Sequence, residues 1–107
     1  MKNMNTNNSI DFSPSLEGRD GEGLLYDVPY LVRDPNEYRM SAQRHEIEVR
    51  NQAVVDDYFV LRSKGTSAHE ARSLVAEKHQ LTPRQVYHCF VWYFQEAKRR
   101  HIPVPDL

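Results

Sequence analysis

Apolar side chains recur at helical spacing in three segments of the chain, and a helix-start signal precedes each segment. The first signal is DPNE at 34–37, where a capping residue is followed by proline at the first helical position and by an acid at the third. The first helix is therefore expected to begin there or near Ser41. It should end near Ser63, because Gly65 follows.

Capping boxes, in which a hydroxyl side chain and a residue three positions later cap each other's backbone, predict two further helices. SAHE at 67–70 opens the second helix, and TPRQ at 82–85 opens a third that continues to about Arg100. In the second helix, the residues expected to face inward are Ala71, Leu74, Val75 and Ala76. In the third helix, they are Val86, Cys89, Phe90, Tyr93 and Ala97.

The first predicted helix carries two apolar stripes on different sides. One stripe, which suits the core, is Ile47, Val54, Tyr58 and Leu61. The other is Val49, Ala53 and Val60. Two stripes need two partners, so the second stripe is expected to contact either an N-terminal arm or another subunit.

The remaining segments divide the chain further. Residues 1–23 are rich in Asn, Ser, Gly and Asp and are expected to form a flexible tail. The segment LLYDVPYLV at 24–32 contains Pro29, which excludes a central strand and predicts an extended arm over 24–33. The helical domain should cover 34–102, and the prolines of HIPVPDL leave 103–107 as a C-terminal tail.

Composition bounds the class of protein. A chain of 107 residues supports one compact domain, and its formal net charge of −1 does not demand a polyanionic partner. The acids are in excess over residues 1–40, whereas bases are in excess afterwards, together with all five histidines. One cysteine, Cys89, allows no intramolecular disulfide and fits a reducing compartment. No apolar run approaches a membrane span, so a cytoplasmic protein is expected.

The segment LVAEKHQLTPRQVYHCF at 74–90 resembles the trihelical, homeodomain-like helix-turn-helix of bacterial and phage DNA-binding proteins. Ala76 is small where two helices must cross, Leu81 is an apolar plug in the turn, and Val86 packs back onto the preceding helix. Family members often have glycine at the turn position that Gln80 occupies here, because it needs a positive φ. The turn is therefore expected to be strained, longer or differently shaped.

The resemblance implies an all-α, three-helix bundle with a helix-turn-helix at about 67–100, sequence-dependent binding of double-stranded DNA, and a role as a small transcriptional regulator or a phage or mobile-element accessory factor. The outward N-terminal residues of the third helix are the expected readers of DNA: Thr82, Arg84, Gln85, Tyr87 and His88. Three cations at its end, Lys98, Arg99 and Arg100, are expected either to contact phosphates or only to complement the helix dipole.

Val91 and Trp92 do not fit a helix lying against DNA, since they fall outside the inward face. Trp92 is expected to pack under the arm, to form a subunit interface, or to stack on an unpaired base. With Val49 and Val60, these residues are the predicted interface of a homodimer or of a protein partner. The alternative function is accordingly a non-catalytic interaction module, an adaptor or inhibitor, that uses a helix-turn-helix-like shape and the Trp92 surface.

Catalysis and metal binding are not expected. His79, His88 and Cys89 are metal-capable but match no zinc spacing. On a helix Glu46 and Glu48 point apart, so with the Asp pair at 56–57 they do not form a catalytic cluster. No phosphate-binding glycine loop or nucleophile motif is present. The sequence predicts no enzyme, no cofactor and no small-molecule substrate.

Overall fold

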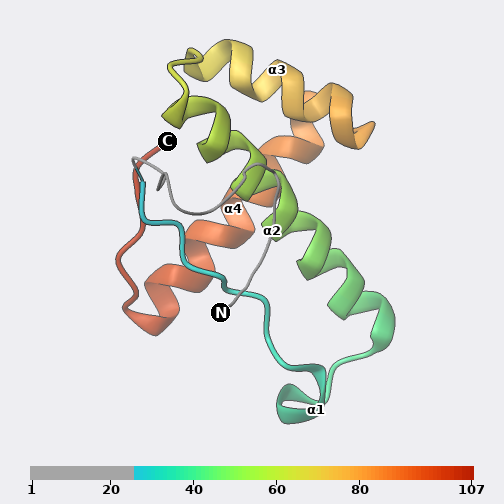
Figure 1. Ribbon diagram of the computed structural model, residues 1–107. Helices are drawn as coiled ribbons and strands as arrows, with labels where there is room; N and C mark the ends of the chain where they lie inside the picture. The colour runs from blue at the N-terminus through green and yellow to red at the C-terminus, as the bar shows by residue number, and fades with distance from the viewer. Residues whose placement is uncertain (1–25) are drawn as a thin grey trace.

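The computed structural model describes residues 26–107, which form four helices and, within that range, no strand. The helices are α1 (Pro35–Tyr38), α2 (Ala42–Ser63), α3 (Ala68–His79) and α4 (Pro83–Arg100) (Figure 1). The all-α prediction is confirmed. The expected flexible tail at 1–23 lies outside the described residues.

The predicted helix starts coincide with the N-caps of the structure. Ser41 and Ser67 accept hydrogen bonds from the backbone of Arg44 and Glu70, respectively, and thereby cap α2 and α3. The two alternative starts of the first helix both occur, because Asp34 caps the single turn of α1 before Ser41 caps α2. The expected count of three helices therefore misses α1.

Among residues 26–107, three residues other than glycine adopt the left-handed conformation, and each ends a helix: Arg39, Gln80 and His101. Gln80 has φ 56° and ψ 47°, so a glutamine takes the conformation for which glycine was expected. Its backbone N–H reaches the carbonyls of Ala76 and Glu77. The expectation of a longer or differently shaped turn is therefore unnecessary, since residues 80–82 suffice to connect α3 to α4.

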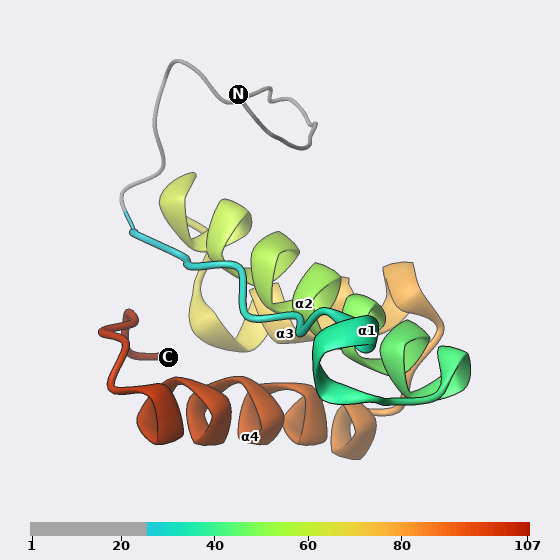
Figure 2. The ribbon, with the colours of Figure 1, turned by 90° about the horizontal axis from the view of Figure 1, so that it is seen from below.

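The core lies where α2 crosses α4, with α3 packed against both (Figures 1 and 2). Tyr58 of α2 packs edge-on against Phe90 of α4, with ring centroids 4.8 Å apart. The predicted inward residues of α4 are all buried: Val86, Cys89, Phe90, Tyr93 and Ala97. In α3 the prediction is wrong for Leu74, which is 39% exposed. The adjacent residue Val75 is buried instead, because that side of α3 faces α2 and α4.

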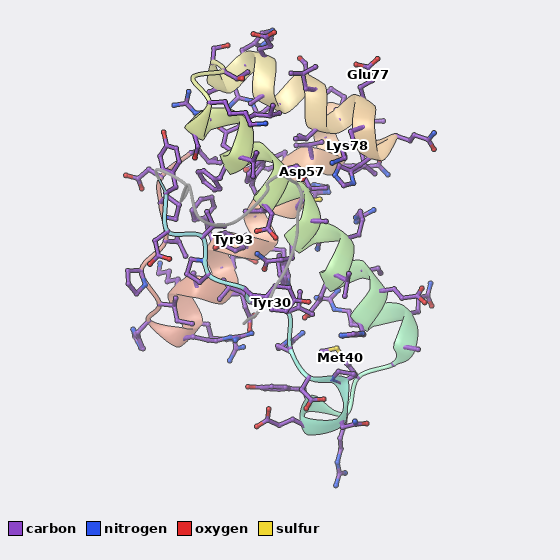
Figure 3. All side chains as sticks on the ribbon, in the orientation of Figure 1. Tyr30, Met40, Asp57, Glu77, Lys78 and Tyr93 are labelled. Atoms are coloured by element: carbon purple, nitrogen blue, oxygen red, sulfur yellow. The ribbon has the colours of Figure 1, made fainter. Side chains whose placement is uncertain are left out.

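Lys78 and His79 in the last turn of α3 bind Asp57 of α2, and these three residues are called the latch below. The carboxylate of Asp57 lies 2.9 Å from Nζ of Lys78 and 2.8 Å from Nε2 of His79, as the side chains in Figure 3 indicate for Asp57 and Lys78. Burial alone raises the pKa of Asp57, but hydrogen bonds from His79 and Lys78 and their charges outweigh it, so this pKa lies below its usual value. The latch holds α3 in place immediately before the turn to α4.

An extended arm, residues 26–33, runs beside α2 and across α4. Only Leu31 of the arm is fully buried, and Tyr26 packs its ring against Phe59 at 5.3 Å. The arm meets α2 through a face that pattern analysis did not select, which carries Glu48, Gln52 and Phe59. The stripe of Val49, Ala53 and Val60 was expected to contact either the arm or another subunit, and these contacts of the arm involve other residues of α2.

Three side chains of α2 and α4 bind the main chain of the arm at Pro29 and Leu31. Gln52 accepts from the N–H of Leu31 at 2.8 Å and donates to the carbonyl of Pro29 at 3.1 Å. Tyr93 donates to the same Pro29 carbonyl at 2.8 Å, and Arg100 donates to the carbonyl of Leu31 at 2.7 Å. Burial raises the pKa of Tyr93, with Asp56 and Asp27 adding to the effect, so its hydroxyl remains a donor.

Loss of the hydroxyl should change the stability of the protein differently at two buried tyrosines. Tyr93→Phe removes the bond to Pro29 and should lower the free energy of unfolding by about 0.5–1.5 kcal/mol. The Tyr58 hydroxyl is buried with no hydrogen-bond partner among residues 26–107, so Tyr58→Phe should leave stability unchanged or raise it. Urea unfolding of both variants measures the difference. An equal loss in the two variants would contradict the assigned bonds.

The arm is also tied by an ion pair. Arg33 contacts the fully buried carboxylate of Glu48 through its guanidinium at 2.5 Å, and its backbone N–H donates to the same group at 3.1 Å. Burial raises the pKa of Glu48, but the hydrogen bonds and charge of Arg33, with a smaller effect of Arg44, bring it below its usual value. The ionised form of Glu48 is therefore the one that holds the arm.

Acid should weaken this tie. Folding lowers the pKa of Glu48, so its carboxylate contributes its full stabilisation at pH values above the pKa of the unfolded chain, about 4.3. That contribution is lost as the pH falls through the pKa of the folded protein. The free energy of unfolding of the wild-type chain, measured by urea titration, should thus fall below about pH 4.5. Glu48→Gln should be less stable at pH 7 and less sensitive to acid. The exposed neighbour Glu46→Gln is the control and should retain the wild-type pH dependence.

Candidate functional site

One face of α4 is turned away from the rest of the described chain. Figure 2 shows α4 along one edge of the molecule, with α2 and α3 on its other side. Because consecutive helical residues are about 100° apart, opposite sides of α4 carry different side chains. The buried set is Val86, Cys89, Phe90, Tyr93, Glu96 and Ala97. The opposite set, called the outer stripe below, is Arg84, Tyr87, His88, Val91, Gln95 and Lys98.

The N-terminal half of the outer stripe is open to solvent. Arg84 and His88 are exposed, and Tyr87 is 63% exposed. The rings of Tyr87 and His88 lie with their centroids 6.0 Å apart. Three of the predicted DNA-reading side chains are thus brought together on the first two turns of α4, where each can offer a hydrogen-bond donor.

Two other predicted reading residues have a structural role. The Thr82 hydroxyl accepts from the Gln85 backbone N–H at 3.1 Å, and the Gln85 side chain accepts from the Thr82 backbone N–H at 2.9 Å. This reciprocal capping box holds the first turn of α4. The side-chain oxygens of Thr82 and Gln85 are therefore engaged in positioning the helix that carries Arg84.

The three cations at the end of α4 differ in their surroundings. Arg99 is ion-paired with Glu96. Arg100 donates to the same carboxylate through Nε at 2.8 Å and also binds the arm carbonyl of Leu31. Among the ion pairs of residues 26–107, none involves Lys98 or Arg84. Of the predicted phosphate contacts, Lys98 is presented outward, whereas Arg100 anchors the arm.

Glu96 is the only carboxylate in α4, and it is buried on the inner side of the helix. Burial alone raises its pKa, but hydrogen bonds from Arg99 and Arg100 and their charges outweigh that effect, so the pKa lies below its usual value. Its negative charge is thus neutralised locally. The outer stripe carries two formal positive charges, Arg84 and Lys98, with no carboxylate from α4 among them.

The residues predicted to form an interface differ in how far they are exposed to solvent. Val49 is 41% exposed, whereas Val60 and Val91 are only partly exposed. Trp92 packs against the core, with its ring 6.2 Å from that of Tyr93. Its Nε1 is buried and has no hydrogen-bond acceptor within residues 26–107. Trp92 thus contributes to packing of the domain, and its side chain remains partly exposed.

Three buried polar residues were not predicted from the sequence: Glu48 and Gln52, which bind the arm, and Glu96, which pairs with the arm-binding Arg100. Their signal in the sequence is weak, because polar residues at spacings of four are common on solvated helix faces. What distinguishes Glu48 and Gln52 is that Val55 and Phe59 continue the same face. A mixed polar and apolar stripe of this kind indicates a helix face covered by polar main chain.

The metal-capable residues do not converge. Within residues 26–107, no group of three His, Cys, Asp or Glu side chains could hold a metal ion. His79 is bonded to Asp57, Cys89 is buried, and His88 is exposed on the outer stripe. No helix in this range is long and apolar enough to cross a membrane.

The chain matches no known protein-family model, and it has no significant match among curated protein sequences or solved structures. Its function is consequently argued from the outer stripe of α4 and the elements that position it.

Proposed function

We propose that the chain binds double-stranded DNA in a sequence-dependent manner, with α3, the turn at 80–82 and α4 acting as a helix-turn-helix. The observation that carries this proposal is the outer stripe of α4, which presents Arg84 and Lys98 with no carboxylate from the same helix between them. Tyr87 and His88 add exposed hydrogen-bond donors to the same surface.

Four side chains of the outer stripe suit contacts with DNA. Arg84 can pair in bidentate fashion with guanine in the major groove, and Tyr87 and His88 can donate to bases or phosphates. Lys98 is fourteen residues from Arg84, which places it about 21 Å further along the axis. Since the major groove is about 12 Å wide, the first turns of α4 enter the groove while Lys98 reaches the phosphate backbone.

The proposed biological role is that of a small transcriptional regulator or of a phage or mobile-element accessory factor. A single helix-turn-helix reads only a few base pairs, so useful specificity needs two copies on adjacent half-sites. Thr82 and Gln85 act in this scheme by fixing the start of α4, which sets the position of Arg84.

The proposal is tested by titrating a fluorescent random-sequence duplex with the full chain and following anisotropy at about 50 and 200 mM salt. Affinity that falls steeply as salt rises is the expected result, because each phosphate contact releases a counterion. Absence of binding at the lower salt concentration would overturn it. The formal net charge of −1 then favours the alternative, a protein-interaction module that uses Val91 and the edge of Trp92.

A further inference from the structure

The arm is bound by four side chains that are called the arm seat below: Glu48 and Gln52 of α2, and Tyr93 and Arg100 of α4. They contact alternate residues of the arm, at positions 29, 31 and 33, and each of them binds a main-chain atom. Between these positions Tyr30 points outward and is 66% exposed. The arm is therefore recognised as an extended strand of main chain, with Leu31 as its one fully buried side chain.

The segment that connects the arm to α2, residues 34–41, is weakly attached to the rest of the molecule. It contains α1, which has no buried residue. Among residues 26–107, its hydrogen bonds are made within the segment or to Arg44 and His45 at the start of α2. Tyr38 contributes a cation–π contact with Arg33 of the arm.

The same segment contains a backbone conformation that an L-residue adopts at a cost. Arg39 ends α1 with φ 53° and ψ 45°, in the left-handed region. This residue turns the chain so that the arm returns alongside the helix that follows it. In an extended connection, residue 39 is free of that requirement.

We propose that the arm seat is also the binding site for the arm of a second copy of this chain, so that two copies exchange residues 26–33 and form a dimer. Every contact of the arm seat is the same in the closed monomer and in the exchanged dimer, because arm and seat are identical in each copy. The two states then differ in the connection at 34–41 and in the entropy of association. The protein concentration and the backbone conformation of Arg39 thus determine whether the closed monomer or the exchanged dimer predominates.

This inference is independent of the proposed DNA binding, because it rests on the arm and its seat. Exchange would also place two copies of α4 in one particle. The occupant of the arm seat is identified by the structure, because residues 28–33 of this chain are the sequence that binds it.

Mixing a variant with a damaged arm and a variant with a damaged seat tests the exchange. Leu31→Asp places a charge at a position that is 1% exposed, and Gln52→Ala removes a seat residue. Neither variant can form an intact arm–seat pair alone. In a mixture, the intact arm of Gln52→Ala can occupy the intact seat of Leu31→Asp.

Size-exclusion chromatography with light scattering at about 1 mM chain, near the effective concentration of a tethered arm, gives the readout. The expected result is a 1:1 heterodimer of twice the 12.6 kDa chain mass in the mixture, with monomers for each variant alone. A mixture of Gln52→Ala with the double variant Leu31→Asp and Gln52→Ala is the control and should stay monomeric, since both copies carry the same damaged seat. Monomers alone in the complementary mixture would overturn the proposal.

Substitution of Arg39 tests the proposal without damaging arm or seat, and so covers the case in which a variant above does not fold. Arg39→Gly should favour the closed monomer, because glycine adopts positive φ readily. Arg39→Val should dimerise with an association constant at least about tenfold above that of the wild-type chain, because each dimer relieves two unfavourable turns. Equal association constants for the two variants, or monomers throughout, would contradict arm exchange.

Discussion

Gln52→Ala is expected to lower the free energy of unfolding by roughly 2–4 kcal/mol. The Gln52 side chain is 1% exposed and makes three hydrogen bonds, to Leu31, Pro29 and Asp56. Its removal leaves the buried N–H of Leu31 without its acceptor, which alone costs about 1–3 kcal/mol, and opens a small cavity beneath the arm. Urea unfolding followed by circular dichroism measures the loss.

The matched control for Gln52 is Gln43→Ala, at an exposed position of the same helix. It should change stability by no more than about 0.5 kcal/mol. A second check is proteolysis of the arm, which should accelerate in Gln52→Ala and not in Gln43→Ala. Equal stabilities for the two variants would mean that the arm does not depend on the bonds of Gln52.

Arg84→Ala is expected to weaken binding to the preferred duplex by about 1–3 kcal/mol and to reduce discrimination at one base position. Arg84 is exposed near the start of α4, where a recognition helix meets base edges, and it belongs to no ion pair among residues 26–107. Its loss should therefore leave the fold intact. Anisotropy titrations against the selected site and single-base variants of it give the measurement.

Lys98→Ala is the comparison for Arg84. It should weaken binding to all duplexes about equally and lower the slope of affinity against salt by about one contact. If Arg84→Ala produced the same uniform loss on every duplex, Arg84 would be a phosphate contact rather than a base contact.

The helices were predictable from the sequence because their ends are encoded locally. Ser41, Ser67 and Thr82 cap the helices at the expected positions, and the buried face of α4 follows from the spacing around Val86. Capping depends on residues three positions apart, so it can be predicted from a single sequence. The turn at Gln80 was anticipated as strained, and it takes the left-handed conformation that the pattern required.

The arm seat was not predictable in the same way, because it depends on long-range contacts. Arg100 contacts a carbonyl 69 residues earlier in the chain, and Tyr93 contacts one 64 residues earlier. Read locally, Arg100 is one of three cations that complement a helix end, and Glu48 and Glu96 are ordinary surface acids. The structure divides the predicted cation cluster, since Arg100 anchors the arm while Lys98 remains on the outer stripe.

The measurement that tests the central claim most directly compares two charge-matched variants for duplex binding. One variant carries Arg84→Gln and Lys98→Gln on the outer stripe, and the other carries Arg44→Gln and Lys64→Gln, two exposed cations outside α4. Each loses two positive charges. If α4 is the DNA-binding surface, anisotropy should show that the first variant loses about tenfold or more in affinity, with a shallower salt dependence, while the second stays near wild type. Equal affinity for the two variants would contradict the assignment of the outer stripe.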